Sequence, residues 1–190
     1  MKRYKINERF YSVQGEGAKV GVPMYFVRFA GCNLACPWCD TDHQQVMEEL
    51  SAGVIVMGAI KSGTRWVCLT GGEPALQVDS DLIDAFHQVG LYVAIETNGT
   101  IELPNRINWV TVSPKPGGVV VLRRAEEVKY VLGKGEPLPI PLIKAPYYWL
   151  SPKFDGMELV PENVEWCLRL VKENPEWRLS VQVHKLIGVR

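Results

Sequence analysis

Three cysteines stand close together in the segment CNLACPWCD, with three residues between Cys32 and Cys36 and two between Cys36 and Cys39. One short loop with this spacing can turn three thiolates toward a single point. An iron–sulfur cluster normally takes four cysteine thiolates, so a cubane held by three keeps one iron open to another molecule. The spacing therefore indicates cofactor chemistry at iron.

The same thiolates also suit tetrahedral zinc, and this alternative stays open on the cysteines alone. A zinc site needs a fourth ligand, and His43 is the nearby candidate. A disulfide is disfavoured because the chain has five cysteines, an odd number, and no secretory signal is evident. We expect Cys68 and Cys167 to pack as small hydrophobic side chains.

The composition indicates one soluble domain over residues 1–190, with 47% hydrophobic residues to form a core. Lys plus Arg equals Asp plus Glu at 21 each, so no global field argues for a nucleic acid or an anionic membrane. The longest apolar stretches are strand-sized, and MKRYKINERF lacks an apolar signal core. We therefore expect a cytoplasmic protein that binds neither nucleic acid nor membrane.

Apolar runs rich in branched and aromatic residues predict a series of strands, near 23–29, 66–70, 91–96, 108–113, 127–132, 146–150 and 179–184. Helical patterns lie between several of them, at about 45–62, 79–89 and 161–173. Such alternation implies parallel βα units. A complete eight-fold barrel usually needs about 250 residues, so we predict an open, partial βα barrel with a mostly parallel sheet.

Polar motifs follow three of the predicted strands, where sites in such sheets gather. These motifs are TGGEP with Thr70, Gly72 and Glu73, ETNG with Glu96 and Asn98, and SPK with Ser113, Pro114 and Lys115. Glycine removes side-chain bulk, so the backbone at Gly72 can approach a ligand closely. Each motif taken alone could also be a simple turn or strand exit.

The cysteine spacing, followed by an aromatic-Cys-Asp step, is similar to that of radical S-adenosylmethionine (SAM) enzymes. This resemblance implies that the open iron of a [4Fe-4S] cluster binds SAM, and that one electron cleaves SAM to a 5′-deoxyadenosyl radical. It further implies that TGGEP and SPK contact SAM. For Glu96 and Asn98 it implies only proximity to the site.

The N-terminal segment narrows the resemblance. FYSVQGEG, then GVPMYFVR, then a cysteine loop ending in Cys-Asp-Thr, resembles the 7-carboxy-7-deazaguanine synthases, as does the C-terminal WRLSVQVHKLIGVR. The resemblance spans the chain and is least close between about 116 and 165. It implies a carbon–nitrogen lyase that converts 6-carboxy-5,6,7,8-tetrahydropterin to 7-carboxy-7-deazaguanine with loss of ammonia. Such a reaction serves queuosine and other deazapurine biosynthesis, with SAM used catalytically.

Carried over motif by motif, the resemblance assigns the site residues. The catalytic cluster ligands are Cys32, Cys36 and Cys39. Thr41 is a Mg²⁺ ligand, although the hydroxyl taken alone could simply cap a loop or helix. The SAM contacts are Trp38, Cys39, Asp40, Gly72, Ser113, Pro114, Lys115, Ser151, Pro152, Lys153 and Phe154. The matched substrate contacts are Val13, Gln14, Gly15, Thr70, His184 and the terminal carboxylate of Arg190. Glu16 and Arg28 are added to this substrate set as candidates from their own chemistry.

Two charged residues of the substrate set have a chemical rationale of their own. Glu16 can accept two hydrogen bonds from an amino-pyrimidinone edge, and Arg28 offers a planar fork to a carboxylate. The alternative is a surface salt bridge between them. His184 could likewise face solvent from an ordinary strand. Surface positions are expected for His43 and His87, and packing roles for the tryptophans at 66, 109, 149, 166 and 177.

Two other interpretations compete with the synthase. A glycyl-radical-enzyme activase shares the cysteine spacing but delivers its radical to a protein. A zinc or redox-binding module explains the cysteines but leaves TGGEP, SPK and the N-terminal motif unexplained. For the synthase we expect a homodimer, since an open barrel has free edges, and a one-electron donor such as flavodoxin or ferredoxin.

Overall fold

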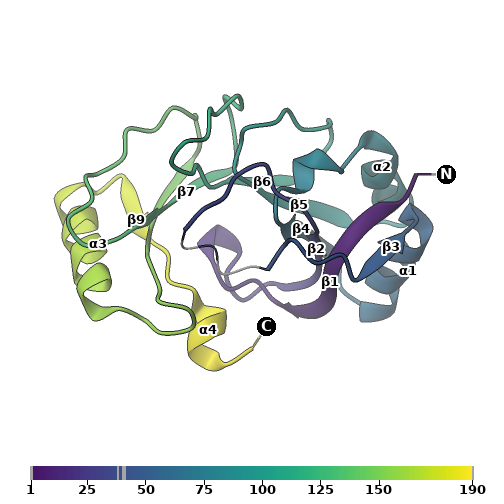
Figure 1. Cartoon of the computed structure of the whole chain (residues 1–190), viewed down its shortest axis with the longest axis horizontal. Coiled ribbons are helices and arrows are strands. Elements are labelled where there is room, and N and C mark those ends of the chain that lie inside the picture. The colour runs from purple at the N-terminus through teal and green to yellow at the C-terminus, as the bar shows by residue number, and fades with distance from the viewer. Residues whose placement is uncertain (1, 38, 40–41, 190) are drawn as a thin grey trace.

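The computed structural model describes residues 2–37, 39 and 42–189, and its elements are shown in Figure 1. The strands are β1 (Tyr4–Val13), β2 (Pro23–Phe29), β3 (Glu48–Leu50), β4 (Trp66–Gly71), β5 (Tyr92–Thr97), β6 (Trp109–Val112), β7 (Glu127–Leu132), β8 (Tyr147–Pro152) and β9 (Trp177–Leu179). The helices are α1 (Ala52–Ser62), α2 (Ser80–Gln88), α3 (Pro161–Glu173) and α4 (Val183–Ile187), with 3-10 turns η1 (Gly17–Lys19) and η2 (Pro74–Leu76).

The strands that the structure describes form one nine-stranded sheet in the order β3-β1-β2-β4-β5-β6-β7-β8-β9. From β2 to β9 each neighbouring pair is parallel, whereas β1 is antiparallel to both β2 and β3. The sheet curves, with α1 and α2 at one end and α3 at the other (Figure 1). The prediction of an open, mostly parallel α/β sheet is confirmed, although β1 and β3 were not predicted.

Two helices follow the sequence prediction closely. α2 begins after Asp79, whose carboxylate accepts a hydrogen bond from Leu82 N at 3.0 Å and so caps the first turn. The face of α2 that carries Leu82, Ile83 and Phe86 is fully buried against the sheet. α3 spans the predicted range and opens at Pro161, which lacks the amide hydrogen that a first helical turn leaves unpaired.

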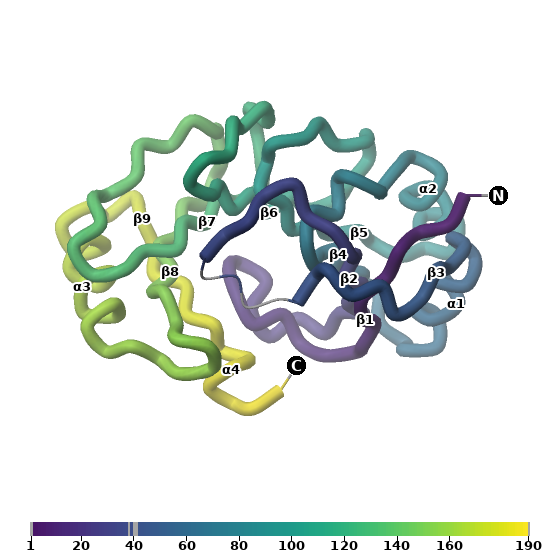
Figure 2. Tube along the Cα trace, in the orientation of Figure 1, coloured from purple at the N-terminus to yellow at the C-terminus, as the bar shows by residue number. Residues whose placement is uncertain are grey.

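Two predicted elements are wrong in part. The helix expected over 45–62 begins only at Ala52, because residues 48–50 form β3 and pair with β1. The strand expected over 179–184 ends at Leu179, and α4 follows from Val183. The amide of Val183 donates to Gly15 O at 3.0 Å, so the chain leaves the sheet there to reach the N-terminal loop (Figure 2).

The main core lies between the sheet and the helices α1 and α2, and a second cluster lies between α3 and strands β7 to β9. Cys68 and Cys167 are fully buried in apolar clusters, as predicted, and burial raises the pKa of Cys167 to about 11. Across the described part of the chain, no helix is both long and apolar enough to cross a bilayer.

Candidate active site

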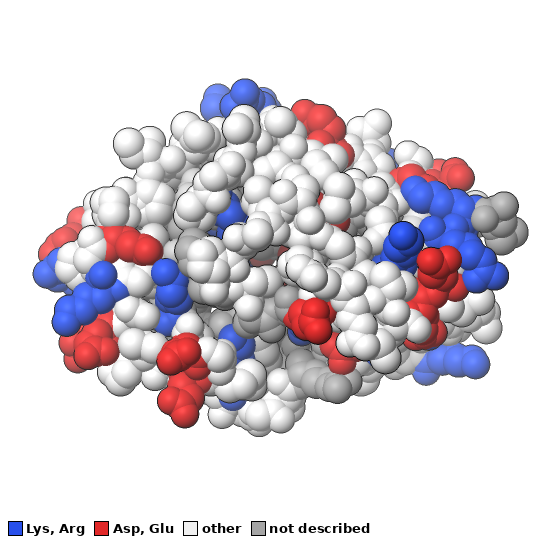
Figure 3. All heavy atoms as spheres, in the orientation of Figure 1, with Lys and Arg blue, Asp and Glu red and all other residues white. Residues whose placement is uncertain are grey.

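A cavity of about 610 Å³ opens at the carboxyl ends of the parallel strands. Four parts of the chain line it: the N-terminal loop, the cysteine loop, the strands β4 to β8 with the segments that follow them, and the C-terminal segment. On the face drawn in Figure 3 the middle is hollowed and mostly uncharged, and charged side chains gather toward the two ends. A cavity of this size is typical of small-molecule sites.

Cys32, Cys36 and Cys39 all line this cavity, and none of the three is joined in a disulfide. Burial raises the pKa of the Cys32 thiol, and the nearby Glu73, Cys36 and Cys39 add to the shift. Among the described residues no three His, Cys, Asp or Glu side chains are gathered closely enough to hold a metal ion. The structure thus brings the thiols to one cavity without converging them on one point. Trp38, Asp40 and Thr41 lie outside the described residues.

The TGGEP exit of β4 packs tightly against the start of the cysteine loop. A Cβ at Gly72 would lie 1.9 Å from the carbonyl oxygen of Gly31 and 3.1 Å from the Cβ of His43. No side chain fits there, so the glycine is required for this close approach. Gly72 itself lines the cavity, with its backbone open to a ligand. His43 and His87 are both half-buried; His43 lines the cavity, and His87 lies on α2 with its Nε2 3.0 Å from Asn108 Oδ1.

Glu73 links the exits of β4 and β5. Its side chain is fully buried, and its carboxylate accepts from Ala75 N at 3.0 Å, from Thr97 Oγ1 at 2.7 Å and from Asn98 N at 2.7 Å. Burial raises the pKa of Glu73, although these hydrogen bonds oppose the shift. The TGGEP and ETNG motifs are therefore held together by one buried carboxylate.

The predicted SAM-binding segments after β6 and β8 flank the same cavity. Ser113 and Lys115 line it after β6, and Lys115 Nζ donates to Ser113 Oγ at 2.6 Å, with Pro114 between them. The end of β8 contributes Ser151 and Pro152, and the residues directly after it contribute Lys153 and Phe154. The structure thus brings together the two segments that the sequence separates by more than thirty residues.

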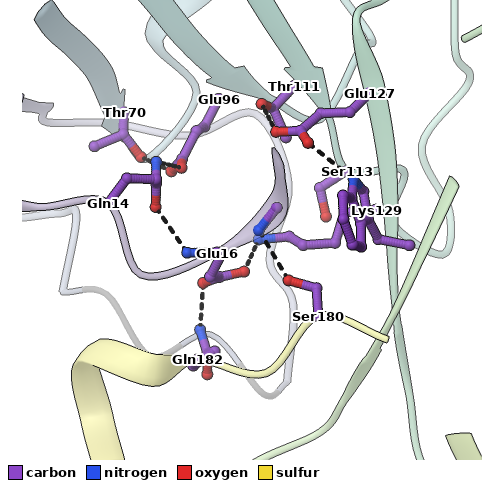
Figure 4. A network of polar contacts seen from close by, with 12 residues as sticks. Gln14, Glu16, Thr70, Glu96, Thr111, Ser113, Glu127, Lys129, Ser180 and Gln182 are labelled. Atoms are coloured by element: carbon purple, nitrogen blue, oxygen red, sulfur yellow. Dashed lines mark hydrogen bonds and ion pairs between the residues drawn. The ribbon is translucent and has the colours of Figure 1, made fainter. Parts of the chain in front are cut away.

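Gln14 enters the site by bonding to Glu96, which follows Ile95 at the end of β5. Gln14 Nε2 donates to Glu96 Oε1 at 2.9 Å, and Thr70 Oγ1 donates to Glu96 Oε2 at 2.7 Å (Figure 4). Thr70 and Glu96 line the cavity, and Val13 ends β1 immediately before Gln14. The proximity expected for Glu96 is confirmed, and its role as the common partner of Gln14 and Thr70 was not predicted.

Glu16 lies at the centre of a second polar group. Its carboxylate accepts from Lys129 Nζ and from Gln182 Nε2, the latter at 2.8 Å (Figure 4). Burial alone would raise the pKa of Glu16, but the charge and hydrogen bond of Lys129 and the Gln182 bond outweigh it and lower that pKa. A Cβ at Gly15 would lie 2.0 Å from His184 Nδ1, so the glycine lets this imidazole pack against the loop. Burial lowers the pKa of His184.

Arg28 is not paired with Glu16, so the alternative of a salt bridge between them is wrong. Its nearest carboxylate is Glu8, with Arg28 Nε and Glu8 Oε2 3.6 Å apart, and its guanidinium lies over the ring of Phe10. Arg28 Nε is buried and has no hydrogen-bond partner among the described residues. Arg190, the last predicted substrate contact, lies outside those residues.

Glu127, at the start of β7, was missed by the sequence reasoning. This buried carboxylate accepts from Ala18 N at 2.8 Å, Thr111 Oγ1 at 2.7 Å, Trp109 Nε1 at 3.2 Å and Trp149 Nε1 at 2.8 Å. A Cβ at Gly17 would lie 2.6 Å from its oxygens. Two of the tryptophans expected only to pack therefore also donate hydrogen bonds. The available signal was the strand period of two, which places Glu127 and Lys129 on the same face of β7.

Residues 26–111 match the Radical SAM superfamily. Together with the open parallel sheet and the three cysteines at its carboxyl edge, this match identifies the chain as a radical SAM enzyme, a class that uses a [4Fe-4S] cluster and SAM. Curated relatives over 98% of the chain are 7-carboxy-7-deazaguanine synthases, 44% identical from Bacteroides thetaiotaomicron (98% of that chain) and 40% identical from Bradyrhizobium diazoefficiens (99%). The crystal structure of QueE from Escherichia coli is similar with a TM-score of 0.75 and 30% identity, covering 96% of this chain and 95% of that one. The chain belongs to the 7-carboxy-7-deazaguanine synthase family.

Proposed function

We propose that this chain is a carbon–nitrogen lyase that converts 6-carboxy-5,6,7,8-tetrahydropterin to 7-carboxy-7-deazaguanine with loss of ammonia, as a single domain over residues 1–190. The observation that carries the proposal is the cavity itself, in which the cysteine loop faces the Glu16 loop. A radical source and a set of groups able to hold a heterocycle are thereby joined in a chain of the synthase family. The glycyl-radical activase and the zinc module are not favoured, since neither accounts for this loop.

Cys32, Cys36 and Cys39 would hold the [4Fe-4S] cluster. The donor set fits, because three thiols outside any disulfide line one cavity while Cys68 and Cys167 are buried elsewhere. When bound, the cluster and SAM supply a carbon radical that removes a hydrogen atom from the substrate. The chain would contribute binding surfaces for SAM at Gly72, at Ser113 to Lys115 and at Ser151 to Phe154. Trp38, Cys39 and Asp40 of the cysteine loop would complete this set of SAM contacts.

The substrate would lie between the Glu16 loop and the cysteine loop. Glu16 accepts from the amino-pyrimidinone edge, a role suited to a carboxylate whose pKa is lowered. Arg28 offers its unpartnered, buried Nε to the substrate carboxylate. The remaining substrate contacts would be Val13, Gln14, Gly15, Thr70, His184 and the terminal carboxylate of Arg190. Glu96 fixes Gln14 and Thr70 relative to each other, which orients the heterocycle.

Thr41 would bind Mg²⁺ beside the substrate carboxylate, since a hydroxyl oxygen suits this hard cation. We also propose a homodimer, a cytoplasmic location where thiols stay reduced, and a one-electron donor such as flavodoxin or ferredoxin. The proposed end use is queuosine or another deazapurine.

The test is product formation by anaerobically reconstituted protein supplied with SAM, a reductant, Mg²⁺ and the pterin, followed by mass spectrometry. The expected result is 7-carboxy-7-deazaguanine from the wild-type protein and none from Cys36→Ala, with SAM consumed in less than stoichiometric amounts. Cleavage of SAM without product would refute the substrate but keep the radical chemistry. Colourless protein without any cleavage would refute both and favour zinc.

A further inference from the structure

Among the described residues, Lys129 is the charged partner of Glu16, and the proposed function leaves it without a task. It lies on β7 and lines the cavity, and its side chain is 12% exposed, as is that of Glu16. Burial alone would lower the pKa of Lys129, but the nearby charges of Glu16, Glu96 and Glu127 raise it above its ordinary value. The side chain is therefore a buried ammonium at the wall of a ligand cavity.

This ammonium has donors to spare. A lysine carries three N–H donors, and in the described part of the chain Glu16 is its one hydrogen-bond partner, so two donors remain for the cavity. Buried donors without an acceptor are costly, at about 1–3 kcal/mol each, and are normally satisfied by a ligand, water or protein. The arrangement thus points to an acceptor atom on the bound molecule.

Glu16 and Lys129 together present acceptors beside a donor (Figure 4). The edge of an amino-pyrimidinone presents the complementary order: an exocyclic amino group, a ring N–H and then a carbonyl oxygen. Building on the proposed function, we propose that Lys129 is a specificity-determining residue that donates to the ring carbonyl oxygen while Glu16 accepts from the two N–H groups beside it.

The substrate carboxylate is a poorer partner for Lys129. Three carboxylates, Glu16, Glu96 and Glu127, already surround the ammonium and would repel a fourth. Arg28 on β2 is a separate candidate partner for the substrate carboxylate. Strands β4, β5 and β6 lie between β2 and β7 in the sheet. The two cations therefore suit opposite ends of one ligand, with Lys129 at the pyrimidinone end.

The test uses two unreactive aromatic analogues that differ at one edge. One is 6-carboxypterin, with an amino group, a ring N–H and a ring carbonyl. The other is 2,4-diaminopteridine-6-carboxylate, in which an amino group replaces that carbonyl and the neighbouring ring nitrogen loses its hydrogen. Their dissociation constants are measured by fluorescence or calorimetry on reconstituted, SAM-loaded enzyme under anaerobic conditions. The wild-type enzyme is expected to prefer the carbonyl compound by about tenfold or more, the range of one hydrogen bond to a charged group.

In Lys129→Met this preference is expected to fall at least tenfold, through weaker binding of the carbonyl compound. Lys129→Gln keeps a neutral donor, so its preference should lie between those of the wild-type enzyme and Lys129→Met. This variant provides the test if Lys129→Met does not fold. Lys172→Met, which removes an exposed lysine of α3, is the matched control and should change neither constant.

An unchanged preference in Lys129→Met would overturn the assignment. The assignment would also be overturned if Lys129→Met weakened binding of 6-carboxypterin but not of pterin, which lacks the carboxylate. Lys129 would then be contacting the carboxylate. If the wild-type enzyme bound neither analogue while still cleaving SAM, the proposed substrate would be refuted, and so would this role of Lys129. If only the role of Lys129 is wrong, the wild-type enzyme will still bind 6-carboxypterin tightly, and Lys129→Met will keep the wild-type preference.

Discussion

Replacing Glu127 by glutamine should destabilise the fold and loosen the Glu16 loop. The native carboxylate accepts from one backbone amide, one hydroxyl and two indoles, contributed by the N-terminal loop, β6 and β8. An amide of the same shape has one acceptor oxygen and points an N–H₂ group at donors. At least one buried donor near Glu127 is then left unpaired.

The magnitude follows from the number of bonds. A hydrogen bond to a charged group contributes about 1.5–3 kcal/mol, and such bonds in one network are not additive. We therefore expect Glu127→Gln to lower the free energy of unfolding by about 2–4 kcal/mol. With a urea dependence of about 2 kcal/mol per molar for a small domain, the midpoint should fall by about 1–2 M.

The assay is equilibrium urea unfolding of the purified protein, followed by tryptophan fluorescence and circular dichroism. Glu102→Gln alters an exposed carboxylate and is the control, expected to stay within about 0.5 kcal/mol of the wild-type protein. The Michaelis constant for the pterin should also rise, because Ala18 N and the Gly17 backbone are held against Glu127. A stability loss below about 1 kcal/mol with an unchanged Michaelis constant would refute the reasoning.

Three further predictions concern other parts of the molecule. Gly72→Ala would place a Cβ 1.9 Å from the carbonyl of Gly31, so we expect weaker SAM binding by calorimetry, and unchanged affinity would contradict the tight packing. Burial opposes ionisation of Asp79, but Lys2 and other donors lower its pKa, so its contribution to stability is present above about pH 4, the unfolded value, and is lost as pH falls through the folded value. The difference in unfolding free energy between the wild-type protein and Asp79→Asn should therefore shrink as the pH falls below about 4. A difference that stays constant with pH would contradict a stabilising role for the ionised Asp79. Thr41→Ala should abolish stimulation of turnover by Mg²⁺, and full stimulation in that variant would remove Thr41 as the ligand.

The N-terminal loop depends on contacts that are remote in sequence. Beyond the bonds to Glu127, Lys19 in η1 lies with its ammonium 4.1 Å from the ring centre of Trp66 and 4.0 Å from that of Trp109. Gly17 N donates to Ser180 Oγ at 2.9 Å. The loop is thus fixed on several sides, which gives Glu16 a defined direction into the cavity.

The sequence by itself determined the class of fold and the placement of the main motifs. Periodicity located strands β2 and β4 to β8 and helices α2 and α3, because each buries one regular apolar face. Parallel strands bring their carboxyl ends to one edge, so the cysteine loop, Gly72, Ser113 and the segment from Ser151 could be expected to meet. Local order in the chain was enough for these conclusions.

Tertiary structure alone decided how charges are paired within the site. Glu16 meets Lys129 and Gln182, which are more than a hundred residues away, and Arg28 faces Glu8 instead of Glu16. The end of the chain forms α4 in place of a strand because it bonds to the N-terminal loop. Pairing of this kind depends on distances between side chains across the curved sheet, and those distances have no signature in the spacing of residues along the chain.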